Sequence, residues 1–240
     1  MKTRINKYLA LCGLGSRRKV EEIILQRRIT VNGVETFDLA CQIDTDRDEV
    51  CLDGKRVIPY DRFYYLILNK PKGYITTLQD EQGRPIVMDL IMEKYIRAGV
   101  FPVGRLDKDS EGLLILTNDG ELANVLTHPN FSVPKEYFVE LNKPLDQKIK
   151  ERIERGVMLY SRKTKPAEIQ YLDQSGKQIR MTISEGKKRQ IRVIFQNFHY
   201  RVKKLKRTAY GPLKLAGIPS GTFRLMRPRE ISALKKMTHS

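Results

Sequence analysis

The chain has 240 residues, 40% of them hydrophobic and 30% charged, a composition typical of a folded globular protein. Its 45 basic and 28 acidic residues give a net charge of +17, which favours a polyanionic partner. Three cysteines without Cys-x-x-Cys spacing and three scattered histidines argue against a disulfide scaffold and a zinc finger. No apolar stretch approaches the roughly 18 residues of a membrane span. With no signal peptide visible, we expect a reduced, cytoplasmic protein with no membrane partner.

Residues 1–28 predict two short helices and carry eight basic against two acidic side chains, a net charge of +6. The first helix follows from the helical spacing of Ile5, Tyr8, Leu9 and Cys12, and Ser16 can cap the second. The first turn of that second helix contains Arg17, Arg18 and Lys19. Cations at this end oppose the helix dipole unless a phosphate binds there. Phosphate binding and simple exposure to solvent both remain open.

Residues 29–60 predict two hairpins, with turns at Asn32-Gly33 and Asp53-Gly54. This segment has three basic and seven acidic residues, a net charge of −4. Residues 58–61 contain a proline and read as a linker. We therefore expect one domain over residues 1–60 and a second over 61–240.

The second domain is predicted to be α+β with a largely antiparallel sheet, because strand patterns dominate and no regular βαβ repeat appears. The expected strands are 63–68, 113–117, 137–141 and 179–183. The expected helices are 88–98, 121–126 and one marked by Ile191, Ile194, Phe195 and Phe198. Residues 186–229 contain thirteen basic and no acidic residues, so they favour contact with a nucleic acid.

Residues 104–112 (GRLDKDSEG) carry three acids at alternate positions, Asp107, Asp109 and Glu111. A calcium loop is ruled out because its twelfth position would be Asn118 instead of a bidentate glutamate. A magnesium site stays open, although no phosphate-loop, dinucleotide or serine-hydrolase motif accompanies it. Asp107 could also be a covalent nucleophile or general base, kept ionised by nearby cations, or merely a turn former.

Five blocks in this chain resemble the RsuA-like family of bacterial ribosomal RNA pseudouridine synthases, in the order of that family. The blocks are KPKG (70–73), GRLD with GLLILTNDG (104–107 and 112–120), PKEY (134–137), EGKKRQIR (185–192) and LKRTAYGPL (205–213). Residues 4–50 resemble an S4 RNA-binding module. The resemblance implies a small S4-like α/β module followed by a catalytic domain built on an extended, mainly antiparallel mixed sheet with flanking helices.

The resemblance also implies a role for individual residues. Asp107 matches the catalytic aspartate, and Arg105 matches an arginine suggested to occupy the space of the extruded nucleotide. Tyr137 matches the tyrosine that lies against the target base, Ile191 a pocket residue, and Arg192 the arginine that pairs with the aspartate. The alternatives, that Tyr137 and Ile191 are core residues and that Arg192 contacts only a phosphate, stay open. RNA contacts are expected from Arg17, Arg18, Lys19, Lys187, Lys188, Arg189, Lys206 and Arg207. Val193-Ile194 departs from the Arg-Met that is frequent in close relatives, which puts some RNA contacts in doubt.

The expected reaction breaks the C1′–N1 bond of a uridine, turns the ring and rejoins it through C5, without cofactor or metal. The base must be flipped or already unpaired. The expected partner is 16S or 23S ribosomal RNA, possibly within an assembly intermediate, and the expected state is a monomer. Two alternatives stay open. One is an inert S4-type RNA-binding or ribosome assembly protein, and the other is a metal-dependent nuclease built on Asp107, Asp109 and Glu111.

Overall fold

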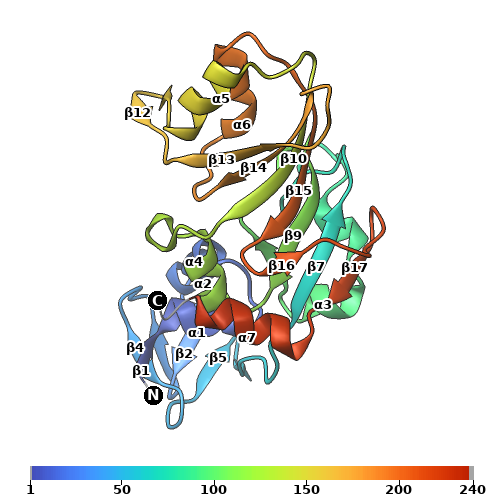
Figure 1. Cartoon of the computed structure of the whole chain (residues 1–240). Helices are drawn as coiled ribbons and strands as arrows, with labels where there is room; N and C mark the ends of the chain where they lie inside the picture. The colour runs from blue at the N-terminus through green and yellow to red at the C-terminus, as the bar shows by residue number, and fades with distance from the viewer. Residues whose placement is uncertain (1, 238–240) are drawn as a thin grey trace. The chain divides into compact units, whose positions relative to one another are not determined.

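The computed structural model describes residues 2–237, which divide into two compact units. The first contains the residues up to Tyr64 together with Glu93–Val100, and the second contains Tyr65–Met92 and the residues from Phe101 onward. Figure 1 shows the elements of both units along the chain. Among the described residues, no helix combines the length and the apolar character needed to cross a bilayer.

The first unit packs two helices and short strands around one apolar cluster. The helices α1 (Ile5–Leu11) and α2 (Arg17–Leu25) contact each other, and both confirm the predicted spacing. Ser16 caps α2 by accepting a hydrogen bond from the backbone N–H of Lys19 at 3.3 Å. The buried cluster consists of Ile5, Tyr8, Leu9, Val20, Ile23, Ile24, Ile29, Ile43 and Val50. The three cations of α2 extend from its exposed side.

The two predicted hairpins also form. In the four-stranded sheet the order is β3 (Val34–Thr36), β2 (Ile29–Val31), β5 (Val50–Leu52) and β6 (Lys55–Arg56), and all pairs are antiparallel. The turn residues Asn32 and Asp53 adopt left-handed backbone angles, with φ of 51° and 49°, and each precedes a glycine. Strand β1 (Lys2–Arg4) pairs separately with β4 (Gln42–Asp44), and α3 (Glu93–Arg97) completes the unit.

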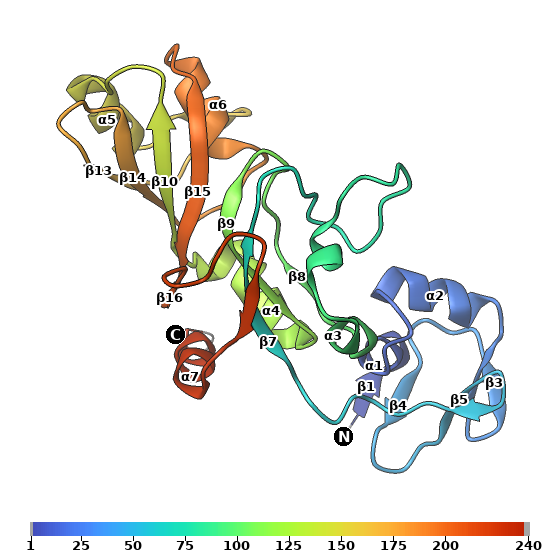
Figure 2. The same cartoon turned by 90° about the vertical axis from the view of Figure 1, so that its right-hand side faces the viewer.

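The second unit is organised by a nine-stranded mixed sheet, which confirms the predicted α+β class. Its path is β13 (Ala167–Tyr171), β14 (Gln178–Ile183), β10 (Lys135–Leu141), β15 (Val202–Tyr210), β9 (Glu111–Thr117), β7 (Tyr65–Lys70) and β17 (Phe223–Leu225). Strand β16 (Leu213–Lys214) pairs with β15, and β8 (Phe101–Val103) pairs with β9. The sheet is antiparallel except for the pair β15–β9. In Figure 2, β13, β14, β10 and β15 lie side by side.

Helices cover parts of this sheet, and two of them are capped by an aspartate. Asp119 caps α4 (Gly120–Thr127), and Asp146 caps α5 (Gln147–Glu154), because each carboxylate accepts backbone N–H groups of the first turn. Helix α5 packs on β13, whereas α6 (Gln190–Asn197) contacts β15 and the hairpin of β11 (Met158–Leu159) and β12 (Arg162–Lys163). The remaining helical elements are η1 (Val87–Leu90), η2 (Pro129–Phe131) and α7 (Pro228–Lys236).

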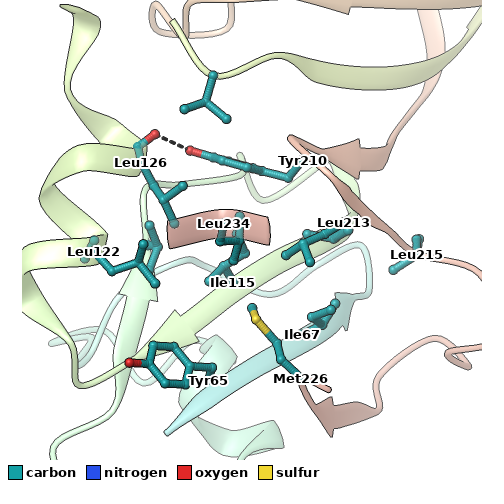
Figure 3. Packing of buried hydrophobic residues seen from close by; sticks show 14 of the residues in the cluster. Tyr65, Ile67, Ile115, Leu122, Leu126, Tyr210, Leu213, Leu215, Met226 and Leu234 are labelled. Carbon is teal, nitrogen blue, oxygen red and sulfur yellow. Dashed lines mark hydrogen bonds between the residues drawn. The ribbon is translucent and has the colours of Figure 1, made fainter. Parts of the chain in front are cut away.

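The apolar core that supports the site packs between the β7–β9 part of the sheet and the helices α4 and α7. Leu122 and Leu126 of α4 and Leu234 of α7 pack with Ile67 and Ile115 of the two strands (Figure 3). Tyr210, at the end of β15, is also buried there and donates a hydrogen bond of 2.6 Å to the carbonyl of Leu126. Burial of these side chains fixes the edge of β9 from which the loop over residues 104–110 departs.

Several local predictions need correction. The helix predicted over 88–98 is wrong, because it is broken into η1 and α3. The carboxylate of Asp89 accepts the N–H of Ile86, and Ile91 adopts an extended backbone, which ends the first helical turn. The strand predicted over 63–68 begins and ends two residues later, at Tyr65 and Lys70. Strands β13 and β15 and helices α5 and α7 were not predicted.

Candidate active site

The loop over residues 104–110 joins β8 to β9 and carries Asp107. Hydrogen bonds hold its backbone from two neighbouring segments. The hydroxyl of Thr76 donates to the carbonyl of Leu106 at 2.8 Å and accepts from the N–H of Leu106 at 3.2 Å. The N–H of Gly73 donates to the carbonyl of Lys108 at 2.8 Å. The loop is therefore tied on both sides of Asp107.

Lys70 is the second support of this loop, and its side chain is fully buried. Its Nζ donates to the carbonyls of Asp107 at 3.1 Å, Ser110 at 2.8 Å and Pro71 at 3.1 Å. Burial lowers the pKa of Lys70 to about 8, although the nearby carboxylates of Asp109, Asp107 and Glu111 oppose that shift. The ammonium thus uses its three N–H donors to hold the turn that positions Asp107.

Asp109, two residues beyond Asp107, forms ion pairs with two arginines. Arg192 lies in α6, and Arg189 immediately precedes that helix. Arg189 donates to both carboxylate oxygens, at 3.1 and 3.2 Å, and Arg192 Nε lies 3.1 Å from Oδ2. Burial opposes ionisation of Asp109, but the hydrogen bonds from Arg189 and the charge of Arg192 outweigh it and hold the pKa below its usual value.

The predicted pairing of Arg192 with Asp107 is wrong in this structure. Arg192 Nη2 donates to the carbonyl of Asp109 at 2.8 Å, and Nη1 donates to the carbonyl of Val202 at 3.0 Å. Arg192 therefore joins the loop to the start of β15. Within residues 2–237, the side-chain carboxylate of Asp107 has no hydrogen bond or ion pair, and it acts on Arg192 and Arg189 only as a nearby charge.

A row of paired residues crosses the sheet beside this loop. Tyr137 of β10 pairs with Arg207 of β15, Arg207 pairs with Gly112 of β9, and Gly112 pairs with Lys70 of β7. Adjacent strands in this register bring residues from four separate segments to one level of the sheet. Tyr137 therefore lies two strands from β9, which carries the Asp107 loop at its start.

Arg207 does not fit its predicted RNA contact. The side chain is 2% exposed, and its Nε donates to the carbonyl of Leu113 at 2.7 Å. The guanidinium also lies 5.1 Å from the ring centroid of Tyr210. Arg207 therefore stabilises the centre of the sheet, at the only parallel strand pair among the described residues.

The other predicted residues lie in three kinds of environment. Tyr137 and Ile191 are buried, at 8% and 3% exposure. Arg105 is exposed, next to the buried Leu106. The expected RNA contacts Lys188 and Arg189 are exposed, as are Arg17, Arg18 and Lys19, and Lys187 and Lys206 are partly buried. Arg17, Arg18 and Lys19 belong to the first unit.

An open cavity of about 240 Å³ adjoins the loop and is lined by Lys72, Gly73, Lys108, Asp109 and Arg189. Sequence reasoning did not assign Lys70, Thr76 or Asp109 to the site as supports. The KPKG block contained a signal for Lys70, but its burial and its carbonyl partners depend on the tertiary fold. Among residues 2–237, no cluster of three His, Cys, Asp or Glu side chains is arranged to hold a metal ion.

Comparison with known proteins defines the class to which this site belongs. Residues 64–197 match the model of the RNA pseudouridylate synthase family. A pseudouridylate synthase of known crystal structure, 27% identical, superposes with a TM-score of 0.72 and covers 96% of this chain and 99% of its own. The second unit therefore has the pseudouridine synthase fold.

Two relatives match almost the whole chain. An uncharacterised RNA pseudouridine synthase of Aquifex aeolicus is 42% identical, over 98% of this chain and 95% of the relative. The ribosomal large subunit pseudouridine synthase B of Bacillus subtilis is 37% identical, over 98% of this chain and 96% of the relative. The chain belongs to the RNA pseudouridylate synthase family and is an isomerase of uridine in RNA.

Proposed function

We propose that this protein converts a specific uridine of 23S or 16S ribosomal RNA to pseudouridine, with Asp107 as the reacting carboxylate. The observation that carries the assignment is the contrast within one loop. Asp109 is occupied by two arginines, while the Asp107 carboxylate has no partner among the described residues and its backbone is held by Lys70. A carboxylate whose backbone is held and whose oxygens have no protein partner is available to a substrate.

The reaction is an internal exchange of bonds. The C1′–N1 bond of the nucleotide breaks, the base turns within the site, and a C1′–C5 bond forms. The proton displaced from C5 is balanced by a proton gained at N1, so no redox partner or phosphate donor is consumed. Asp107 serves this sequence as a nucleophile or as a base, and Lys70 and Thr76 keep its loop in place.

The target base must leave its stack to reach Asp107. We assign Tyr137 to the face of the flipped base, Ile191 to the apolar lining beside it, and Arg105 to the space that the nucleotide vacates. Tyr137 is buried and pairs with Arg207 of β15, which in turn pairs with Gly112 of β9. Arg105 is exposed beside Leu106. Stacking on an aromatic ring contributes about 1–3 kcal/mol per base and offsets part of the unstacking cost.

Residues 1–60 are proposed as an S4-like RNA-docking module. Support comes from the two-helix arrangement of α1 and α2 and from the exposed cations Arg17, Arg18 and Lys19 at the start of α2. Backbone N–H groups at a helix N-terminus attract phosphate, and neighbouring lysines and arginines add to that attraction. We propose that the protein works as a monomer in the cytoplasm, on free RNA or on an assembly intermediate.

A metal-dependent nuclease is the weaker alternative, because Asp109 is neutralised by Arg189 and Arg192 and cannot serve a cation as well. The test is incubation of the protein with unmodified 16S and 23S RNA in the presence of EDTA. Pseudouridine is mapped by carbodiimide-dependent stops of reverse transcription. A new stop in one RNA of unchanged length supports the proposal. Shortening of the RNA in a parallel incubation without EDTA, but not with it, would support the nuclease. Tight binding without any stop would support an inert binding protein.

A further inference from the structure

The hairpin of β11 and β12 has an unusual turn. Its two central residues, Tyr160 and Ser161, have φ of 50° and 63°. Two-residue turns with positive φ at both positions strongly favour Asn-Gly or related pairs, because side chains are strained there. A tyrosine and a serine at these positions cost stability that an ordinary turn sequence would avoid. Strain of this kind points to a function for the side chain that it displays.

The strained turn presents an aromatic side chain to solvent. Tyr160 is 60% exposed, whereas the preceding Leu159 is buried and anchors the hairpin. The hydroxyl of Tyr160 donates to the carbonyl of Lys188 at 3.2 Å. The ring is therefore held at its polar end while most of its apolar surface remains open. An oriented and accessible ring of this kind can receive a flat partner at little cost in side-chain entropy.

Basic residues follow Tyr160 along the hairpin. Arg162, Lys163 and Lys165 follow it and are exposed, and no acidic residue occurs between 158 and 165. Across the hairpin, Lys187 Nζ donates to the carbonyl of Lys163 at 3.4 Å. Glu185, the acid in the segment between β14 and α6, lies 3.6 Å from Lys187 and also accepts a hydrogen bond from Gln190. The surplus of positive charge matches a phosphate backbone.

The hairpin is continuous with the candidate active site. Tyr160 contacts the backbone of Lys188, and the next residue, Arg189, forms the ion pair with Asp109 and lines the cavity. A strand of RNA that delivers a nucleotide to Asp107 can therefore pass along residues 187–189 to the hairpin.

We propose that Tyr160 is a stacking platform for an unpaired base that flanks the target uridine, with Arg162 and Lys163 contacting the adjoining phosphates. The proposal rests on RNA being the substrate, and it assigns to the hairpin a preference for single-stranded over paired RNA. Aromatic rings stack on bases of any sequence only when those bases are not already paired. The Tyr160 surface thus selects a loop or bulge around the target.

The test replaces the turn with one that is easier to form. Tyr160→Asn combined with Ser161→Gly removes the ring and relieves the positive-φ strain, so that loss of fold cannot explain loss of binding. Tyr160→Phe keeps the ring but removes the hydroxyl. Tyr171→Ala is the matched control, because Tyr171 is 39% exposed on β13 and its hydroxyl also donates to a backbone carbonyl, that of Leu145. The probes are a fluorescent unstructured dodecanucleotide and an RNA duplex of equal length.

The double variant should bind the single strand about tenfold more weakly than the wild type, with the same salt dependence and unchanged duplex binding. Tyr171→Ala should bind like the wild type. Tyr160→Phe keeps the ring but loses its hydrogen bond to Lys188, so it should bind more weakly than the wild type and more tightly than the double variant. Equal single-strand affinity of the double variant and the wild type, or no binding by the wild type, would overturn the proposal. Tritium release from 5-tritiated uridine in ribosomal RNA is measured in parallel with the wild type. Its absence would reject the proposed function alone, because the binding comparison does not depend on turnover.

Discussion

At the scale of single residues, the site depends on a division of labour between two carboxylates two positions apart. Asp109 holds Arg189 and Arg192, whereas the Asp107 carboxylate, which we propose meets the substrate, has no partner within residues 2–237. The family resemblance singled out Asp107 and Arg192 and expected Arg189 to contact RNA, but it paired Arg192 with Asp107, whereas the structure pairs both arginines with Asp109. The pairing depends on where α6 packs relative to the loop, and residues separated by some eighty positions carry no local signal of that geometry.

Asp109→Asn should therefore loosen the site without removing the reacting group. Two arginines would lose their shared counter-charge, and a third of the Asp109 side chain is exposed, so screening limits the loss of stability to about 1 kcal/mol. We expect kcat to fall on the order of tenfold, a loss of about 1.4 kcal/mol of transition-state stabilisation. Urea denaturation and steady-state kinetics measure the two effects. The control Asp80→Asn breaks a comparable pair with Arg84 outside the site, and equal kcat values for the two variants would contradict this role of Asp109.

Lys70 and Lys135 make stability depend on pH. Burial lowers the pKa of each to about 8, while an unfolded lysine titrates near 10.4, about two units higher. Between these values the unfolded chain binds protons that the folded chain has released. The free energy of unfolding should therefore rise as pH increases from about 8 to 9.5, below the usual range of tyrosine.

Lys70→Met separates the two contributions, because it should remove part of this rise and leave the share of Lys135. Urea midpoints followed by circular dichroism at several pH values measure the slope. A wild-type stability that is flat or falls over this range would contradict the pKa assignments. The variant should also lower kcat with little change in RNA affinity, since Lys70 holds the backbone of Asp107 and not the RNA.

At the scale of elements, the close approach of β9 and β15 requires a glycine. Gly112 has φ of +104°, and a Cβ there would lie 2.3 Å from the carbonyl oxygen of Arg207. Gly112→Ala should destabilise the second unit by about 2 kcal/mol or more, because backbone atoms cannot move aside.

Gly120→Ala provides the matched control, since Gly120 lies in α4 and a Cβ there meets no atom within 4 Å. Gly120 is the first residue of α4, so we expect a gain smaller than the roughly 0.5–1 kcal/mol of a helix interior. Thermal unfolding of the two variants checks both signs. An unchanged melting temperature for Gly112→Ala would show that β9 and β15 can accommodate a Cβ at this position, which would contradict the close approach seen in the structure.

Elements with a clear period were predictable, and those with mixed content were not. Alternation in residues 179–183 and the apolar run 113–117 identified strands β14 and β9. Strand β15 escaped because Lys203, Lys204, Lys206 and Arg207 interrupt its apolar residues, and a central strand was not expected to bury an arginine. The row from Tyr137 to Lys70 needs the register of four strands, which no local pattern contains.

At the scale of the whole molecule, positive charge is distributed over both units, and each should contribute to RNA affinity. Replacing Arg17, Arg18 and Lys19 with glutamine should weaken binding to ribosomal RNA. It should also reduce the steepness of log K against log salt by about 2–3, because a protein that contacts fewer phosphates releases fewer counterions on binding. The control replaces the exposed Arg47, Lys55 and Arg56 of the same unit. Indistinguishable slopes for the two triple variants would contradict RNA docking through the start of α2.

Family membership came from motif order in the sequence and is confirmed by the matches along nearly the entire chain. What the whole structure adds is the support of the loop that carries Asp107 by Lys70, Thr76 and the arginines held by Asp109. These contacts join segments that lie far apart in sequence. They explain in physical terms why Asp107 can be both fixed and unoccupied.

The most direct test of the account is a pseudouridine map of ribosomal RNA treated with the wild type and with Asp107→Asn. The amide keeps the size of the side chain and removes its charge, and the Asp107 side chain holds no other described residue, so the fold and RNA affinity should persist. The account predicts a new pseudouridine with the wild type and none with the variant, at equal binding of both proteins. Pseudouridine formed by Asp107→Asn at the wild-type rate would contradict the assignment of Asp107 as the reacting group.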